Sequence, residues 1–128
     1  MEITINLFGS PDSPSVQLGT TIKPVEDFYG DGPLMAFLVS IPHCIFNSIY
    51  AVAEKEGLKL KCRVRARYVL DEKFLKTGIY RFTKIILEVS SQDCDEEDLR
   101  DLVAKVKMEC PIYLSFMDRM EIQVLKGE

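Results

Sequence analysis

The chain has 128 residues, which fits a single domain spanning residues 1–128 that is large enough to bury a substantial core. Its 20 acidic residues outnumber its 16 basic ones, giving a formal net charge of −4 and disfavouring a general binder of nucleic acids or anionic membranes. Four cysteines without a CxxC spacing, together with one histidine, disfavour a disulfide scaffold and a structural zinc site. The nucleotide-binding patterns GxGxxG and GxxxxGK[ST] are absent, so we expect no cofactor and no metal.

Residues 1–8 bear on the cellular location of the protein. They have neither a basic start nor a long apolar run, so we expect no signal peptide. The sequence therefore predicts a cytoplasmic protein whose thiols are mostly reduced at rest.

The N-terminal third of the sequence predicts a strand hairpin followed by a loop. Apolar and polar residues alternate over residues 2–7, which is the period of a β-strand. Residues 9–14 are rich in Gly, Ser and Pro and predict a turn, after which residues 16–22 suggest a second strand. Residues 24–32 are predicted to form a loop.

Residues 33–55 predict a long helix that is apolar on all sides. Pro33 suits a first helical turn, and Gly57 follows the segment as a stop signal. The length would permit a membrane span, but Pro42, His43 and Asn47 lie at its middle, and a buried central helix fits the sequence better. In so small a protein we expect a partner subunit to cover one side of this helix.

Residues 58–70 and 79–90 predict a second hairpin. Apolar residues occupy the even positions 58–70 and basic residues occupy the odd positions 59–67, so the two kinds of side chain face opposite ways. The basic face could bind phosphates or RNA; alternatively it is a solvated sheet face paired with acids from a neighbouring strand or from residues 95–98. The negative net charge favours the second interpretation.

The C-terminal third predicts an amphipathic helix, a short helix and a strand. Acidic residues 95–98 suit a helix start, and apolar residues then recur at helical spacing up to Cys110. Pro111 ends this helix and opens another over residues 111–117, and residues 121–125 form a terminal strand. The fold class predicted from the whole order is α+β.

Cys44 and Cys110 are the candidate catalytic residues. Cys110 precedes Pro111, so it would cap the last helix near unpaired N–H groups that favour a thiolate. Alternatively, it is only the last apolar residue on the buried face of the preceding amphipathic helix. Cys44 follows Pro42, which can bend the helix and open space, although buried cysteines are commonly inert. His43 points about 100° away from Cys44 and is expected to be a hydrogen-bonded interior or interface residue.

This order of elements resembles the OsmC/Ohr family of thiol-dependent hydroperoxide reductases. The resemblance covers roughly residues 32–128 and depends on Gly32-Pro33, on Cys44 eleven residues after Pro33, on residues 51–57, and on Cys110-Pro111 within the run 108–112. It implies an OsmC-like fold, namely an intertwined homodimer in which the long helices that carry the cysteines pack centrally.

The resemblance also implies a mechanism and a set of partners. Cys44 would be the peroxidatic thiol that attacks a hydroperoxide, and Cys110 the resolving thiol that forms a disulfide reduced by an external dithiol. The family activates its first cysteine with an N-terminal arginine held by a glutamate just inside the helix. Here Leu34 occupies the glutamate position, no arginine precedes Arg63, and Lys23 is the only cation upstream of Cys44.

Two functions therefore remain open at the level of sequence. One is an enzyme that reduces hydroperoxides with Cys44 and Cys110 and an activator of another kind. The other is a non-peroxidatic protein of the same fold that acts as a redox sensor or binds a small apolar ligand. The sequence assigns no role to Cys62 or Cys94.

Overall fold

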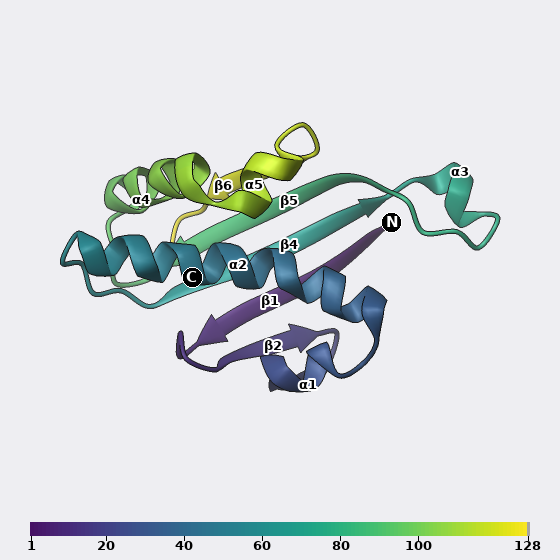
Figure 1. The fold of residues 1–128 in the computed structure, drawn as a ribbon, viewed down its shortest axis with the longest axis horizontal. Coiled ribbons are helices and arrows are strands. Elements are labelled where there is room, and N and C mark those ends of the chain that lie inside the picture. Colours follow the sequence, from purple (N-terminus) through teal and green to yellow (C-terminus); the bar gives the residue numbers. More distant parts are fainter. Residues whose placement is uncertain (128) are drawn as a thin grey trace.

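The computed structural model describes residues 1–127, which form one six-stranded sheet and five helices (Figure 1). In chain order the elements are β1 (Glu2–Gly9), β2 (Pro14–Leu18), β3 (Thr21–Pro24), α1 (Val25–Tyr29), α2 (Pro33–Lys55), β4 (Cys62–Leu70), α3 (Glu72–Leu75), β5 (Phe82–Ser91), α4 (Glu96–Glu109), α5 (Pro111–Phe116) and β6 (Met120–Val124). The strand order is β3-β2-β1-β4-β5-β6, in which only β6 joins its neighbour in parallel. The predicted α+β class is confirmed.

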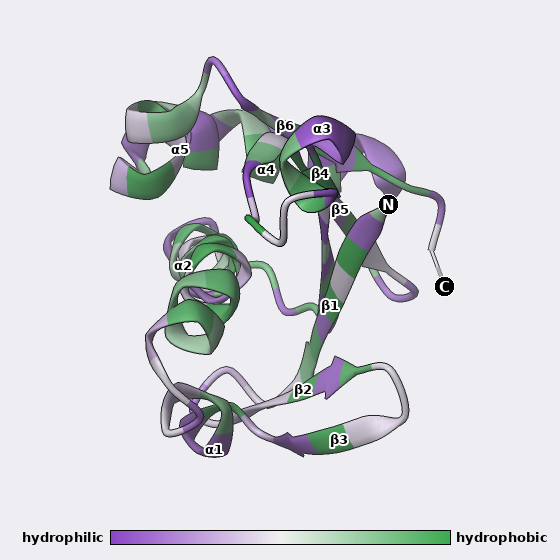
Figure 2. Ribbon diagram, turned by 90° about the vertical axis from the view of Figure 1, so that its right-hand side faces the viewer, coloured by the Kyte–Doolittle hydropathy of each residue, from purple (hydrophilic) through white to green (hydrophobic). Residues whose placement is uncertain are grey.

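The helices α2, α4 and α5 lie on one face of the sheet (Figure 2). The strands turn their apolar positions towards these helices, as the alternation in β4 predicts: Cys62, Val64, Ala66, Tyr68 and Leu70 are all buried. The Tyr68 hydroxyl donates a hydrogen bond to the main-chain carbonyl of Leu38 in α2, so this buried polar group is satisfied and links helix to sheet.

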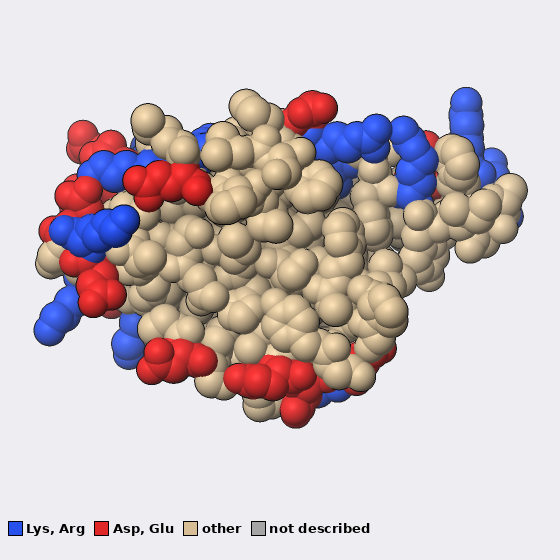
Figure 3. Space-filling model, in the orientation of Figure 1, with Lys and Arg blue, Asp and Glu red and all other residues tan. Residues whose placement is uncertain are grey.

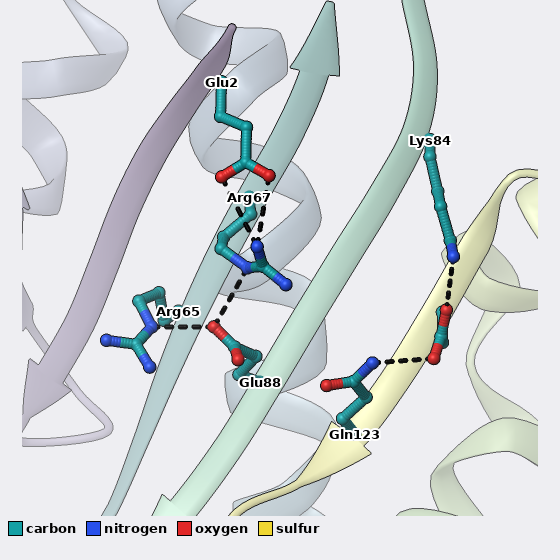
Figure 4. A network of polar contacts seen from close by, with 7 residues as sticks. Glu2, Arg65, Arg67, Lys84, Glu88 and Gln123 are labelled. Carbon is teal, nitrogen blue, oxygen red and sulfur yellow. Dashed lines mark hydrogen bonds and ion pairs between the residues drawn. The ribbon is translucent and has the colours of Figure 1, made fainter.

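The opposite face of the sheet carries the basic residues of β4, of which Arg65 and Arg67 are paired with acids (Figure 4). Arg65 Nε lies 2.8 Å from Glu88 Oε1 on β5, and Arg67 Nη1 lies 3.1 Å from Glu2 Oε1 on β1. Ion pairs across neighbouring strands support the register of the sheet. These contacts match the interpretation of a solvated sheet face whose cations are paired with acids from a neighbouring strand.

The N-terminal region differs from the prediction in two respects. Residues 14–24 form two strands rather than one, because Gly19 adopts a positive φ of 61° and the chain turns there. Residues 24–32 are not simply a loop: they contain the helix α1, which buries Val25 and Phe28 at the spacing of one helical turn.

The second hairpin begins later in each strand than the alternation indicates. At the start of β4, the Lys61 N–H donates to the Asp93 side chain rather than to a strand partner. Before β5, Ile79 and Tyr80 are exposed and do not belong to the strand. The connection between the two strands also contains the short helix α3, whose N-cap Asp71 accepts a hydrogen bond from the Lys73 N–H.

Helix α2 begins at Pro33 as predicted, but within one chain it is not buried on all sides. Its buried side packs on the sheet, while an open side exposes Leu34 (46%) and Phe37 (38%). Asn47 and Ala51 continue this open side at helical spacing, and Cys44 lies half-buried among them. Within residues 1–127, α2 is the one helix long and apolar enough to cross a membrane, a test that the core helix of a globular domain also passes.

Candidate active site

The two predicted cysteines are positioned by different helices. Cys44 lies in the middle of α2, two residues after Pro42. Cys110 is both the last cap of α4 and the first cap of α5, with an extended backbone at φ −77° and ψ 117°. That conformation follows from Pro111, because a proline disfavours the helical region for the residue before it. The sharp break between α4 and α5 therefore places Cys110 beside α2.

The structure brings Cys44 and Cys110 together. Their sulfur atoms lie 3.6 Å apart although the residues are 66 positions apart in the chain. Both cysteines are free, Cys44 is half-buried, and only 1% of Cys110 is exposed. A disulfide requires about 2.05 Å between sulfur atoms, so a shift of roughly 1.6 Å would join the pair. The site can thus hold either two thiols or one disulfide.

The surroundings of Cys44 keep its thiol protonated. Burial, and after it the neighbouring Cys110, raise the pKa of Cys44 to about 11. Two hydrogen bonds act in the opposite direction, one from the Ser48 side chain and one from the backbone N–H of Ile112. Ile112 is the second residue of α5, so the start of this helix donates to Cys44, whereas the thiol of Cys110 makes no capping hydrogen bond. The predicted cap position of Cys110 is therefore present, but the side chain does not act as a cap.

A pocket of about 430 Å³ opens at Cys44. Its lining comes from α1 and from the open side of α2: Tyr29, Ser40, His43, Cys44, Asn47, Ser48 and Ala51. The Tyr29 hydroxyl lies 2.7 Å from His43 Nδ1, and the two rings are 5.7 Å apart between centroids. His43 is thus hydrogen-bonded, as expected, and its partner is Tyr29. The pocket makes Cys44, unlike Cys110, accessible to a small molecule.

Tyr29 lies outside the set of site residues that the sequence predicts. The region before α2 predicts a loop, and Tyr29 reaches the pocket only because α1 packs on α2. The sequence pattern that could predict α1 is the apolar pair Val25 and Phe28, which is spaced by one helical turn and preceded by Pro24. Together with the acids at positions 26 and 27, this pair is typical of a short helix.

A comparison with protein families shows to which family this chain belongs. The sequence model of the family described as OsmC-like protein matches residues 29–124. The chain belongs to the OsmC-like family. No curated protein sequence matched the chain.

Solved structures share the fold of this OsmC-like protein at low sequence identity. An OsmC like protein from Mycoplasma pneumoniae is 17% identical with a TM-score of 0.57, and the match covers 96% of this chain and 94% of that one. The organic hydroperoxide resistance protein OhrB of Bacillus subtilis is 15% identical with a TM-score of 0.59, covering 98% and 97%. An organic hydroperoxide resistance protein from Elizabethkingia anophelis is 16% identical with a TM-score of 0.59, covering 96% and 94%.

The cations that could replace the missing arginine of this OsmC-like protein are engaged elsewhere. Lys23 pairs with Asp31 at 2.7 Å, and Arg65 and Arg67 lie on the sheet face opposite α2. Three further arginines also have other partners: Arg63 lies over the Phe8 ring, Arg81 pairs with Asp71, and Arg119 donates to the Phe82 carbonyl. Within residues 1–127 the lining of the Cys44 pocket includes no lysine or arginine. Leu34, which occupies the glutamate position, is exposed on the open side of α2.

The other two cysteines lie outside this pocket. Cys62 is buried at the start of β4, where its backbone N–H donates to the Tyr50 hydroxyl, and burial raises the pKa of its thiol to about 12. Cys94 is half-buried in the turn before α4, and burial and neighbouring acids raise its pKa. Among residues 1–127 no group of three His, Cys, Asp or Glu side chains is placed to hold a metal ion.

A second, larger pocket adjoins the first along α2. It has a volume of about 670 Å³ and shares Asn47 and Ala51 with the Cys44 pocket. Its other lining residues come from the end of α2, from the segment that follows it, and from the β1–β2 turn: Pro11, Asp12, Tyr50, Ala53, Glu54, Gly57, Leu58, Lys59 and Leu60. A small molecule with an extended apolar part could occupy both pockets.

Proposed function

We propose that this protein reduces hydroperoxides, with Cys44 as the peroxidatic thiol and Cys110 as the resolving thiol. The single observation that carries the proposal is the 3.6 Å separation between their sulfur atoms. Membership of the OsmC-like family supports it, and so does the difference in access, because Cys44 lines a pocket and Cys110 is buried behind it. The first thiol to meet a substrate would therefore be Cys44.

The proposed reaction has two steps, oxidation of Cys44 and disulfide formation, and the disulfide is then reduced. The Cys44 sulfur attacks the outer oxygen of the hydroperoxide; an S–O bond forms, the O–O bond breaks, and the remaining oxygen leaves as an alcohol after taking the thiol proton. The Cys110 sulfur then attacks the sulfenic acid of Cys44, so that an S–S bond forms and water leaves. An external dithiol, by exchange, returns both cysteines to thiols and is itself oxidised to a disulfide. We also propose a cytoplasmic location, where such thiols would be kept reduced at rest.

The partner that fits the open side of α2 is a second copy of this chain. Residues 33–53 contain no charged side chain, and Figure 3 shows a broad uncharged surface over α2 and α5 with charged groups towards its edges. The exposed apolar residues of the two helices are Leu34, Phe37, Leu114 and Phe116, with Met117 directly after α5. An exposed apolar surface of this kind marks an interface. A homodimer would cover it and enclose the pocket at Cys44.

One observation favours the second candidate function, a redox sensor or a protein that binds a small apolar ligand. The pKa of Cys44 is raised to about 11, and the described residues that line the pocket include no lysine or arginine to lower it, so the thiol is less reactive than an activated one. The adjoining pocket of about 670 Å³ offers space for an apolar ligand. A sensor would form the same disulfide, but it would not turn over many equivalents of peroxide.

The test measures both thiol loss and turnover. The reduced protein is mixed with cumene hydroperoxide, and free thiols are counted after quenching; the proposal predicts a loss of two thiols per chain and continued peroxide consumption when dithiothreitol is present. Cys44→Ser should abolish both, whereas Cys94→Ser, which alters another half-buried cysteine, should retain both. Loss of two thiols without turnover would favour the sensor. Retention of all four thiols would refute the peroxidase.

A further inference from the structure

The pocket at Cys44 places a tyrosine and a histidine beside a thiol, and its lining within residues 1–127 includes no lysine or arginine. Tyr29, His43 and Cys44 all line this pocket, and the Tyr29 hydroxyl lies 2.7 Å from His43 Nδ1. A thiol with a pKa of about 11 is ionised in only about one molecule in 10⁴ at pH 7. An attack that depends on preformed thiolate would therefore be slow at neutral pH, and the proton of Cys44 needs another route.

We propose that the Tyr29 hydroxyl relays this proton from the Cys44 thiol to the departing oxygen of the hydroperoxide, and that His43 holds the hydroxyl in place. This inference rests on the proposed peroxidase function and assigns it an activator. It replaces the cation of the family pattern with a neutral hydroxyl. Tyr29 would touch the substrate, whereas His43 would act through Tyr29 as a positioning residue.

The fold brings the three side chains to the pocket from two helices. His43 and Cys44 are adjacent on α2, so they point about 100° apart and do not face each other directly. Tyr29 is the last residue of α1, which packs against α2, and its hydroxyl bonds to His43. Tyr29 therefore joins both of these α2 side chains in the lining of one pocket.

The protonation states of the pair suit a relay. Burial, and then the nearby Cys44, raise the pKa of Tyr29, so its hydroxyl keeps its proton at neutral pH. Burial lowers the pKa of His43, and the opposing effect of Glu26 on α1 is smaller, so the imidazole is neutral. In the tautomer that carries a hydrogen on Nδ1, His43 donates to the Tyr29 oxygen. The hydroxyl hydrogen is then free for a ligand in the pocket.

The relay conserves charge at every stage. As the Cys44 sulfur forms its bond to the outer peroxide oxygen, the thiol hydrogen passes to the Tyr29 oxygen, and the original hydroxyl hydrogen passes to the inner oxygen as the O–O bond breaks. The products are a sulfenic acid on Cys44, an alcohol and an unchanged Tyr29. No thiolate, alkoxide or imidazolium accumulates, so the step does not need an arginine.

The test compares two reactions of the same thiol in the full-length protein. Rates of Cys44 reaction with cumene hydroperoxide and with iodoacetamide are measured at pH 7 for the wild type and for Tyr29→Phe. Iodide leaves without a proton, so alkylation does not use the relay. We expect the peroxide reaction to slow by about 10²-fold, as for a lost general acid, while alkylation changes less than about twofold. Tyr80→Phe removes an exposed hydroxyl outside the pocket and should alter neither rate.

His43 variants test the positioning role. His43→Leu should lower the peroxide rate without lowering alkylation, and His43→Asn, which keeps a donor near the position of Nδ1, should restore part of the peroxide rate. Equal slowing of both reactions in Tyr29→Phe would indicate a structural role and overturn the relay. An unchanged peroxide rate would overturn it as well, while leaving the proposed function intact. A wild-type protein that does not react with peroxide at all would overturn the proposed function and the relay with it.

Discussion

Oxidation of the Cys44–Cys110 pair is expected to stabilise the fold measurably. The two residues are 66 positions apart, so a disulfide between them would close a large loop of the unfolded chain. The chain-entropy relation gives about 4 kcal/mol for a loop of that length, and strain reduces such gains to about 2–4 kcal/mol in practice. Because the sulfur atoms already lie 3.6 Å apart, we expect little strain and a gain in the upper part of that range.

The gain in the free energy of unfolding can be measured as a rise in the midpoint temperature of thermal unfolding. For a chain of 128 residues, 1 kcal/mol corresponds to roughly 3–5 °C, so a gain of about 3–4 kcal/mol should make the oxidised protein unfold roughly 9–20 °C above the reduced one. Circular dichroism melts of both forms, with the Cys44–Cys110 disulfide verified by peptide mapping, measure this shift. Cys110→Ser should melt at the same temperature with or without oxidant. A verified disulfide that leaves the midpoint unchanged, or lowers it, would refute the inference that the folded chain already holds the two thiols in position to bond.

Three further predictions concern the thiol, the core and the interface. The alkylation rate of Cys44 should rise about tenfold per pH unit from pH 7 to 10, because its pKa of about 11 keeps the thiolate a minor species that grows with pH; a plateau near pH 8.5 would contradict the raised pKa. Tyr68→Phe should lower the free energy of unfolding in urea by about 1–2 kcal/mol, because the buried Leu38 carbonyl loses its donor; an unchanged midpoint would show that the bond contributes nothing. Phe37→Glu should convert the proposed dimer to a monomer in analytical ultracentrifugation, whereas Phe74→Glu, at a similarly exposed position on α3, should not; a Phe37→Glu protein that remains dimeric would place the interface elsewhere.

The parts of the fold that follow local rules could be predicted from the sequence. The alternation in residues 62–70 identifies the buried and outward faces of β4, and the outward arginines find acids on adjacent strands. Pro33 marks the start of α2, and Pro111 marks the boundary between α4 and α5. In each case a local steric or periodic constraint decides the structure before any distant contact forms.

The features that depend on tertiary contacts could not be predicted in this way. Periodicity placed Cys44 and Cys110 on separate helices, but their proximity was expected only from the resemblance to a family. The sequence indicates a loop at Tyr29, because α1 has only five residues and is held by packing against α2 rather than by helix propensity. The hydrogen bond from Ile112 to Cys44 likewise depends on how α5 meets α2.

The central claim is that Cys44 attacks the peroxide and Cys110 resolves the product. Its most direct test is the capture of the sulfenic acid in Cys110→Ser, in which the resolving thiol is absent and the intermediate should persist. The variant is treated with one equivalent of cumene hydroperoxide in the presence of dimedone and mapped by mass spectrometry. We expect a dimedone adduct on Cys44 and none on Cys62 or Cys94. An adduct confined to another cysteine, or no adduct on any of them, would contradict it.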